Sequence, residues 1–220
     1  MFLSQLEFNP RSREAQRDLA RPYELHRTLA LAFGTPDGQD YRAAHGVLFR
    51  LEFSARGVPV VLVQSLTKPN WSALPANYLG SPARSKPVAS TISAGQVLGF
   101  RLVAQPTKKV TAPGQRQGKR VALLDTGPDD APTPARQWLH RQGTRYGFEL
   151  LHTLSEEIPS YGNKASTESA KNQLQLYGVR FDGLLRVHDP TLVGAAIQQG
   201  IGPGKAFGFG LLSVAPAASY

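Results

Sequence analysis

The C-terminal part of the chain contains the stretch Gly200-Ile201-Gly202-Pro203-Gly204-Lys205-Ala206-Phe207-Gly208-Phe209-Gly210. It carries five of the 21 glycines, and so dense a cluster needs a local reason, because glycine costs backbone entropy on folding. The stretch lies between a predicted helix, Pro190 to Gln199, and a predicted strand, Phe209 to Val214. Its amides and its single lysine suit an anion such as a phosphate. The alternative is a tight turn between helix and strand.

Two common nucleotide-binding motifs do not fit this stretch. A P-loop has the pattern G-x-x-x-x-G-K-[ST] between a strand and a helix. Here the spacing from Gly200 to Gly204 is one residue too short, and Ala206 replaces the magnesium-binding hydroxyl. The dinucleotide fingerprint G-x-G-x-x-G also fails, since Phe207 falls at the third glycine. One interpretation that remains is a site for the anionic backbone of a polymer.

Composition favours a polyanionic partner. The chain has 220 residues, enough for one large domain or two of about 100 residues each. Its formal net charge is +9, which suits a partner such as a nucleic acid. No run of about 18 apolar residues occurs, so neither a membrane span nor a membrane partner is expected. Met1 to Pro10 has no signal-peptide pattern. The chain has no cysteine, and we expect a cytoplasmic location.

The N-terminal half follows an order of strand, helix, strand and strand. Phe2 to Phe8 alternates apolar and polar residues and predicts the first strand. Val47 to Phe53 and Pro59 to Leu66 predict two more strands, joined by a hairpin turn at Ser54 to Gly57. Trp71 to Leu79 predicts a short helix. No clear pattern marks a last strand. The order of the other elements suggests that the N-terminal half of the chain is ferredoxin-like.

The first helix is predicted from Pro22 to Phe33. Proline suits the first helical position, where its missing N–H would be unpaired anyway, and Gly34 ends the helix. Tyr23 and His26 lie three residues apart in the first turn, so they are neighbours on the helix surface. The basic residues beside them are Arg21 and Arg27.

The second half begins after a linker predicted at Ser81 to Ser93. From Gln96 to Leu124 there is no Asp or Glu, and Pro and Gly residues mark turns, so we predict an extended basic hairpin. Its basic residues are Arg101, Lys108, Lys109, Arg116, Lys119 and Arg120. In a chain that is 19% charged, six bases without an acid favour a surface for a polyanion. The alternative is a solvated positive face.

The remaining elements again approximate β-α-β-β-α-β. A helix is predicted from Pro134 to Tyr146 and a strand from Phe148 to Ile158. Leu174 to Val187 predicts a hairpin that turns at Asp182-Gly183. Asp189-Pro190 starts the last helix as cap and first residue. We find no internal sequence repeat, so the two halves resemble each other only in element order.

His26 is the candidate acid–base residue. It lies in the first turn of a helix, where amides and the helix dipole favour a phosphate, and Tyr23 is beside it. The dipole lowers the histidine's proton affinity and a bound phosphate raises it, which suits proton transfer near neutral pH. The alternatives are a structural histidine and a half-buried core tyrosine. No metal site is predicted, because the adjacent pairs Asp129-Asp130 and Glu156-Glu157 have no partners at ligand spacing.

Five segments follow one another along the chain: Arg17-Asp18-Leu19-Ala20, Pro22-Tyr23-Glu24-Leu25-His26-Arg27, Val61-Leu62-Val63-Gln64-Ser65, Gly118-Lys119-Arg120-Val121-Ala122-Leu123 and Gly200 to Val214. Together they closely resemble the CasE endoribonucleases of type I-E CRISPR systems, which are subunits of the Cascade surveillance complex. The resemblance covers nearly the whole chain. The Gly-rich loop combined with Tyr-x-x-His is far more specific than either motif alone.

The resemblance implies an α+β fold of two tandem ferredoxin-like (RRM-like) βαββαβ domains with antiparallel sheets, which we place at residues 1–85 and 94–220. It implies cleavage of CRISPR precursor RNA at the base of each repeat hairpin, with no metal and no cofactor. The 2′-hydroxyl attacks the adjacent phosphate, and the products carry a 5′-hydroxyl and a 2′,3′-cyclic phosphate or 3′-phosphate. The implied partners are the repeat RNA hairpin (crRNA) and other Cascade subunits.

The resemblance also assigns roles to residues. The catalytic tyrosine and histidine of the family fall on Tyr23 and His26, and the basic hairpin matches the surface that grips the RNA stem. The predicted RNA-binding residues are Arg21, Arg27, Lys108, Lys109, Arg116, Lys119, Arg120, Gly202, Gly204 and Lys205. Two other classes stay open. One is a non-catalytic RRM-type RNA-binding protein, although Ala206-Phe207-Gly208-Phe209 is only faintly similar to its aromatic pattern. The other is a structural subunit that binds protein partners.

Overall fold

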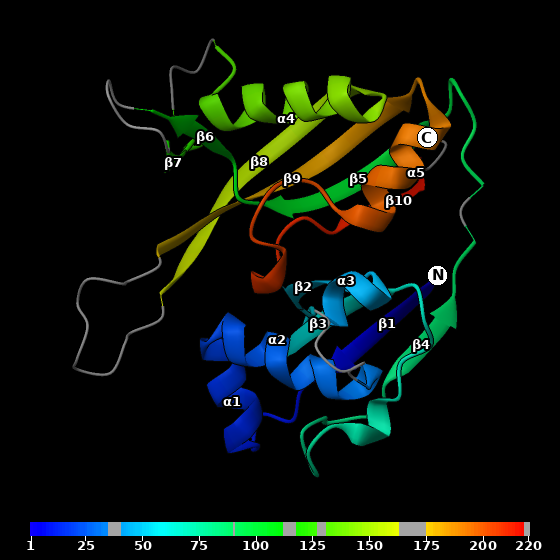
Figure 1. The fold of residues 1–220 in the computed structure, drawn as a ribbon, viewed down its shortest axis with the longest axis vertical. Helices are drawn as coiled ribbons and strands as arrows, with labels where there is room; N and C mark the ends of the chain where they lie inside the picture. Colours follow the sequence, from blue (N-terminus) through cyan, green and yellow to red (C-terminus); the bar gives the residue numbers. More distant parts are fainter. Residues whose placement is uncertain (35–40, 90, 112–117, 127–130, 163–174, 218–220) are drawn as a thin grey trace. The chain divides into compact units, whose positions relative to one another are not determined.

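A computed structural model describes residues 1–34, 41–89, 91–111, 118–126, 131–162 and 175–217 (Figure 1). The chain divides into two compact units. The first includes Met1–Ser90 and Gly204–Leu211, and the second includes Thr91–Ser160 and Leu176–Pro203 and continues from Leu212. The domain limits at residues 1–85 and 94–220 stay a prediction.

The first unit is built on an antiparallel sheet with the strand order β2-β3-β1-β4 (Figure 1). Its strands are β1 (Phe2–Glu7), β2 (Leu48–Phe53), β3 (Pro59–Ser65) and β4 (Arg84–Pro87). β1 pairs with β3 on one side and with β4 on the other. The first strand thus lies between the third and the fourth, as in a ferredoxin-like sheet.

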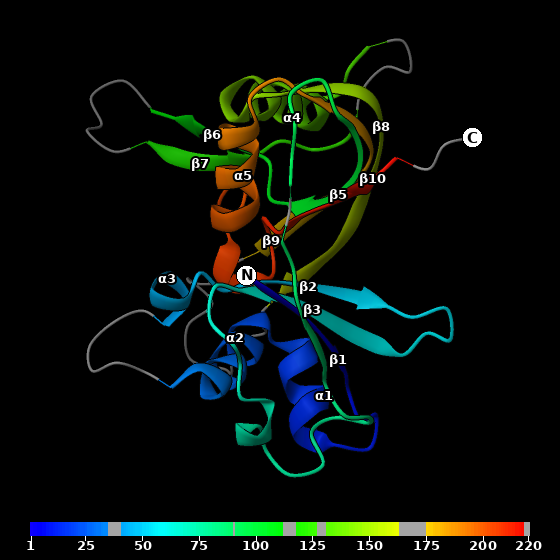
Figure 2. The same ribbon diagram turned by 90° about the vertical axis from the view of Figure 1, so that its right-hand side faces the viewer.

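Helices of the first unit cover one face of this sheet (Figures 1 and 2). They are α1 (Arg13–Ala20), α2 (Pro22–Ala30), α3 (Tyr41–His45) and the short 3-10 turns η1 (Leu31–Phe33) and η2 (Trp71–Ala73). Leu25 and Leu29 of α2 pack into one buried cluster with Leu6 of β1 and with Val61 and Val63 of β3. The alternating apolar residues of the strands therefore meet the apolar stripe of α2.

The second unit has a sheet with the same pattern, in the order β10-β5-β9-β8. Its strands are β5 (Val97–Ala104), β8 (Phe148–Gly162), β9 (Gln175–Val187) and β10 (Leu212–Pro216). Two helices, α4 (Pro134–Tyr146) and α5 (Pro190–Gln199), complete the unit (Figure 2). Each helix begins with a capping side chain followed by proline: Thr133 before α4 and Asp189 before α5. A separate hairpin of β6 (Thr107–Val110) and β7 (Lys119–Ala122) lies between β5 and α4 in the sequence.

The predicted fold class, two tandem ferredoxin-like domains with antiparallel sheets, is confirmed. The predicted hairpin within Leu174 to Val187 is wrong, because β9 continues through Asp182-Gly183 without a turn. A side chain at Gly183 would collide with the carbonyl oxygen of His152 in neighbouring β8. Gly183 therefore lies inside a strand and not in a hairpin turn, and its missing side chain allows the backbones of β8 and β9 to approach closely.

Among the described residues, no helix is both long enough and apolar enough to cross a membrane.

Candidate active site

The N-terminus of α2 is formed by Arg21 and Pro22. Arg21 is the N-cap residue, and its side chain makes no capping hydrogen bond. Its carbonyl oxygen accepts hydrogen bonds from the amides of Glu24 (2.8 Å) and Leu25 (3.2 Å). Proline at the first position leaves no N–H unpaired there. The start of α2 combines the positive end of a helix dipole with an arginine, and both features favour an anion.

The outer surface of α2 carries the two residues predicted to be catalytic. Pro22, Leu25, Thr28 and Leu29 are buried, so the helix is anchored by its inner side. Tyr23 is 49% exposed, and His26 is partly exposed. The centroids of the Tyr23 and His26 rings lie 6.4 Å apart, as residues three positions apart in a helix should. The structure therefore brings these two side chains together on an accessible surface.

His26 is held by a tyrosine that the sequence analysis did not select. The Tyr41 hydroxyl, from α3, lies 2.8 Å from Nδ1 of His26 and donates to the carbonyl oxygen of His26 at 2.7 Å. The two rings are also in contact, with centroids 4.8 Å apart. Gly34 to His45 is rich in Gly, Asp and Pro, which is typical of a loop. The sequence signal for a helix at Tyr41 is only that Tyr41 to His45 is a short run free of Gly and Pro. A contact between residues 15 positions apart has no local pattern.

The ring of Tyr41 is itself fixed by packing. It is only 6% exposed and stacks on Phe33, with centroids 6.0 Å apart. Phe33 also contacts the rings of His45 and Trp71, at 5.6 Å and 5.9 Å. This aromatic cluster connects α3, η1 and η2 behind His26. Its shape restricts Tyr41 to the position from which its hydroxyl reaches α2.

A buried carboxylate attaches α2 to α1. Asp18 of α1 is fully buried and accepts hydrogen bonds from Thr28 Oγ1 (2.6 Å), Tyr78 Oη (2.9 Å) and the guanidinium of Arg17 (2.8 Å). Burial, followed by this hydrogen bond to Asp18, raises the pKa of Tyr78 above its ordinary value. The hydrogen bond to Asp18 likewise raises the pKa of Arg17. All the polar groups around Asp18 are therefore donors that match a charged carboxylate.

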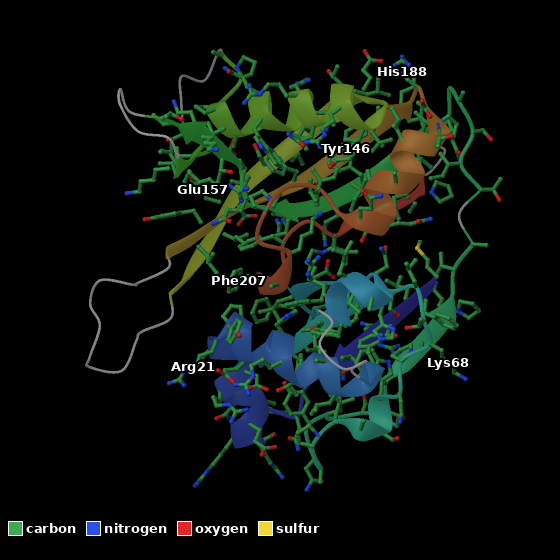
Figure 3. All side chains as sticks on the ribbon, in the orientation of Figure 1. Arg21, Lys68, Tyr146, Glu157, His188 and Phe207 are labelled. Atoms are coloured by element: carbon green, nitrogen blue, oxygen red, sulfur yellow. The ribbon has the colours of Figure 1, made fainter. Side chains whose placement is uncertain are left out.

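The basic residues at this site differ in their local partners. Arg27 lies 3.5 Å from Glu24, one turn earlier on α2, in an exposed ion pair. Arg21 is exposed at the start of the helix (Figure 3). An exposed pair of this kind is weak, so Arg27 can turn toward a phosphate at little cost.

The Gly-rich loop adopts the backbone that its composition predicts. All five glycines have positive φ: Gly200 (74°), Gly202 (82°), Gly204 (77°), Gly208 (86°) and Gly210 (90°). At two of them a side chain would also lack space, since a Cβ at Gly202 would lie 3.0 Å from the Trp138 ring and one at Gly208 would lie 3.1 Å from the Phe49 ring. Glycine is therefore needed here for backbone conformation and for close packing.

The second part of this loop belongs to the first unit. It contains the 3-10 turn η4 (Lys205–Phe207), which packs against α2 and β2, and Figure 3 labels Phe207 in this turn. The buried Arg50 of β2 donates to the carbonyl oxygen of Leu211 at 3.0 Å, and its guanidinium also pairs with Glu52 at 2.7 Å. The loop thus brings Lys205, a predicted RNA-binding residue, to the helix that carries Tyr23 and His26.

The predicted basic hairpin is formed by β6 and β7, but its predicted member Arg101 lies instead in β5 and pairs with Asp182. In their register Lys109 lies opposite Arg120, and Lys108 lies opposite Val121. Lys108, Lys109, Lys119 and Arg120 are all exposed. Residues directly opposite each other share one face of a hairpin, so Lys109 and Arg120 form a like-charged pair.

The predicted site residues thus fall into two groups. Arg21, Tyr23, His26, Arg27 and Lys205 belong to the first unit, together with Gly204. The hairpin residues and Gly202 belong to the second unit. Arg116 lies outside the described residues.

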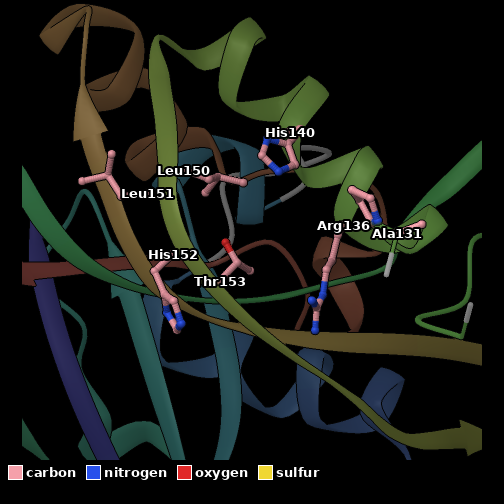
Figure 4. A pocket seen from close by; sticks show the side chains of 8 residues that line it. Ala131, Arg136, His140, Leu150, Leu151, His152 and Thr153 are labelled. Carbon is pink, nitrogen blue, oxygen red and sulfur yellow. The ribbon is translucent and has the colours of Figure 1, made fainter. Parts of the chain in front are cut away.

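A cavity of about 310 Å³ in the second unit contains none of the predicted site residues (Figure 4). It lies between α4 and β8, and its polar lining includes Arg136, His140, His152 and Thr153. Arg136 is engaged, since its Nε donates to Ser155 Oγ at 2.6 Å. In the part of the chain that the structure describes, no group of three or more His, Asp or Glu side chains is arranged to hold a metal ion.

Comparison with known proteins identifies the family. The model of the CRISPR-associated protein family matches residues 1–216 of this chain. The chain belongs to this family. Within the family it is similar to the CRISPR-associated endoribonuclease Cse3 of Thermus thermophilus, with 42% identity over 98% of this chain and 100% of the relative. It is also similar to the Cascade subunit CasE of Escherichia coli, with 32% identity over the same shares of both chains.

The fold agrees with that of a solved family member. Thermus thermophilus Cse3, bound to an RNA that represents a pre-cleavage complex, matches with a TM-score of 0.80 and 39% identity. The match covers 98% of each chain. The similarity to Cse3 therefore extends over both units of this chain, and the CasE-type resemblance found in the sequence is confirmed.

Proposed function

We propose that this chain is a metal-independent endoribonuclease that cleaves CRISPR precursor RNA within its repeat hairpins and remains bound to the crRNA as a Cascade subunit. The observation that carries the proposal is the placement of His26 beside Tyr23 on the accessible surface of α2, with a second tyrosine holding the histidine. Support comes from the full-length similarity to Cse3, which is named an endoribonuclease, and to CasE, which is named a Cascade subunit. The proposed location is the cytoplasm.

The proposed reaction uses the RNA itself as nucleophile. The 2′-oxygen forms a bond to the adjacent phosphorus while the bond from phosphorus to the 5′-oxygen breaks. The proton of the 2′-hydroxyl passes to a base, and a proton is delivered to the departing 5′-oxygen. The products are a 2′,3′-cyclic phosphate, which water can open to a 3′-phosphate, and a 5′-hydroxyl.

His26 is the proposed proton-transfer residue. Imidazole exchanges protons near neutral pH, and a partly exposed ring on α2 can approach a phosphodiester. Tyr23 has a hydroxyl that can both donate and accept a hydrogen bond, so its proposed role is to orient the phosphate or relay a proton. The two rings are close enough for both to contact one phosphodiester.

Positive charge around α2 would stabilise the phosphorane. The helix start, Arg21, Arg27 and Lys205 all favour negative charge at the same helix. Lys205 is brought there by η4, which packs against α2. These residues, with Gly204 before η4, are proposed to bind the RNA at the cut, and Gly202 is a proposed RNA-binding residue of the second unit.

The hairpin of β6 and β7 is the proposed grip on the RNA stem. Its cross-strand neighbours Lys109 and Arg120 repel each other, and a phosphate between them would relieve this repulsion. Lys108 and Lys119, on the other face, add positive charge for a polyanion. Arg116 is proposed to act with them.

A repeat RNA with one 2′-deoxy nucleotide just upstream of the cut tests the mechanism. We expect it to bind like the unmodified RNA and to stay intact, because the nucleophile is missing. The unmodified RNA should be cut equally well with excess EDTA. Loss of cleavage in EDTA that magnesium restores would contradict metal independence, and cleavage of the 2′-deoxy RNA at the same phosphate would contradict the nucleophile. An RNA that binds but is never cut would indicate a non-catalytic RNA-binding protein.

A further inference from the structure

The contact between Tyr41 and His26 determines which imidazole nitrogen carries a proton. The Tyr41 oxygen lies 2.7 Å from the His26 carbonyl oxygen and 2.8 Å from His26 Nδ1. Two oxygens at 2.7 Å need a hydrogen between them, and a carbonyl oxygen can only accept. The single hydroxyl proton of Tyr41 is therefore committed to the backbone of α2.

The Nδ1 contact must then run in the opposite direction. With its proton on the carbonyl side, the Tyr41 oxygen can only accept from the imidazole, so Nδ1 carries a hydrogen. In a neutral imidazole only one nitrogen is protonated, which makes Nε2 the nitrogen that bears the lone pair. When the ring becomes charged, both nitrogens donate and the Tyr41 contact is unchanged.

We propose that Tyr41 is a positioning residue that fixes His26 in its Nδ1–H form, so that Nε2 is the atom that exchanges protons with the RNA. This inference rests on the proposed function for the RNA step, but the assignment of the tautomer does not. Tyr41 acts through His26 and not on the RNA. Its own position is fixed by burial and by stacking on Phe33.

The arrangement uses one hydroxyl for two tasks. By donating to the carbonyl of His26, it ties α3 to the middle of α2, and by accepting from Nδ1 it sets the rotation of the ring on the same residue. Ring contact at 4.8 Å limits the remaining freedom of the imidazole. A histidine on an exposed helix surface would otherwise sample several rotamers and both tautomers.

The test is a spectroscopic measurement on Tyr41→Phe. This variant keeps the buried ring and removes only the hydroxyl. Long-range ¹H–¹⁵N spectra of ¹⁵N-histidine-labelled protein, with His26→Gln to assign the signal, should show Nδ1–H in the wild type and a shift toward Nε2–H in Tyr41→Phe. The matched control is Tyr78→Phe, which removes another buried tyrosine hydroxyl, here one bonded to Asp18, and should leave the His26 tautomer unchanged.

Kinetics complete the test. Tyr41→Phe should lower the single-turnover cleavage rate by about 10- to 100-fold, by analogy with residues that orient a metal-binding histidine through its second nitrogen, with unchanged affinity for the 2′-deoxy RNA. Tyr78→Phe keeps the Thr28–Asp18 hydrogen bond that joins α2 to α1, so it should cleave at nearly the wild-type rate once folding is confirmed. The proposal would be overturned if His26 carried its proton on Nε2 in the wild type. It would also be overturned if His26 kept its proton on Nδ1 in Tyr41→Phe. A wild type that shows Nδ1–H but cuts no RNA would instead refute the proposed function and leave the tautomer assignment standing.

Discussion

Asp18 and Thr28 form a buried hydrogen bond of 2.6 Å that joins α1 to α2. Neither residue is part of the proposed chemistry, yet Thr28 lies two positions after His26 and on the opposite side of the helix. Because Thr28 and Tyr78 donate to the same carboxylate oxygen, α1, α2 and the segment before β4 are held at one point. The orientation of α2 therefore depends on a carboxylate that is fully buried.

Asp18→Ala should destabilise the protein strongly. The change leaves the hydroxyls of Thr28 and Tyr78 without their acceptor in a buried place, and breaking a buried charged network typically costs about 3–5 kcal/mol. Urea unfolding followed by circular dichroism measures the loss. The control is Glu24→Gln, which breaks only the exposed pair with Arg27 and should cost less than about 0.5 kcal/mol. Equal losses in the two variants would show that Asp18 is not an anchor.

Tyr78 should make the protein lose stability at alkaline pH. Its pKa is raised in the folded protein, so above about pH 10 the unfolded chain releases this proton and the folded chain keeps it. The contribution of Tyr78 is thus fully present below about pH 10 and declines as pH rises, by up to about 1.4 kcal/mol per pH unit. Urea unfolding at several pH values from about 9 to 11 should show a steeper decline for the wild type than for Tyr78→Phe. Parallel curves would mean that the pKa of Tyr78 is the same in both states.

His26→Ala should abolish most cleavage without loss of RNA binding. Removing a positioned acid or base typically costs at least about 10²-fold in rate. Single-turnover cleavage of repeat RNA gives the rate, and binding of the 2′-deoxy RNA gives the affinity. His188→Ala is the control, since this exposed histidine pairs only with Glu149 among the described residues and should leave cleavage unchanged. If His26→Ala cuts as fast as the wild type, the active site lies elsewhere.

The elements that could be predicted from the sequence are those whose boundaries depend on local chemistry. Pro22 and Gly34 mark the ends of the segment that forms α2 and η1, and Asp189-Pro190 marks the start of α5. The hairpin of β6 and β7 was evident from its turn residues and its one-sided charge. The neighbouring positions of Tyr23 and His26 follow directly from helix geometry.

The parts that could not be predicted depend on contacts between distant residues. β4 lies within the predicted linker Ser81 to Ser93, and all four of its residues are exposed, so no apolar alternation marks it. It forms because its backbone pairs with β1, where Ser85 lies opposite Ser4. α1 likewise buries only Ala15 and Asp18, too few residues for an apolar stripe. Tyr41 was missed for the same reason, since its role requires α3 to reach α2.

Gly208→Ala should destabilise the Gly-rich loop beyond the cost of its backbone conformation. Gly208 has φ 86°, and an added Cβ would lie 3.1 Å from the buried Phe49 ring. Gly57→Ala is the matched control, because Gly57 has φ 73° but open space around a Cβ. The control measures the strain alone, about 1–2 kcal/mol, and Gly208→Ala should exceed it by about 1 kcal/mol or more in urea unfolding. Equal losses would mean that the Phe49 ring moves aside freely.

The basic hairpin should contribute RNA affinity rather than chemistry. Changing Lys108, Lys109, Lys119 and Arg120 together to Ala should weaken binding of the repeat hairpin. It should also reduce the slope of log affinity against log salt concentration by about one unit or slightly less for each phosphate that the variant no longer binds. The single-turnover cleavage rate at saturating protein should stay near the wild-type value, because none of these residues belongs to the unit that carries His26. Filter binding at several salt concentrations measures the slope.

A charge-matched control separates a specific surface from net charge. Changing Arg11, Arg56, Lys68 and Arg84 to Ala removes the same four positive charges from exposed positions outside the hairpin. If the hairpin residues contact phosphates, this control should retain most of the affinity and nearly the full salt slope, because the slope depends on the phosphates that basic residues neutralise directly. Equal effects of the two quadruple variants would indicate that net charge alone attracts the RNA. An unchanged slope in the hairpin variant would show that Lys109 and Arg120 face only solvent. No phosphate would then lie between them to offset their mutual repulsion.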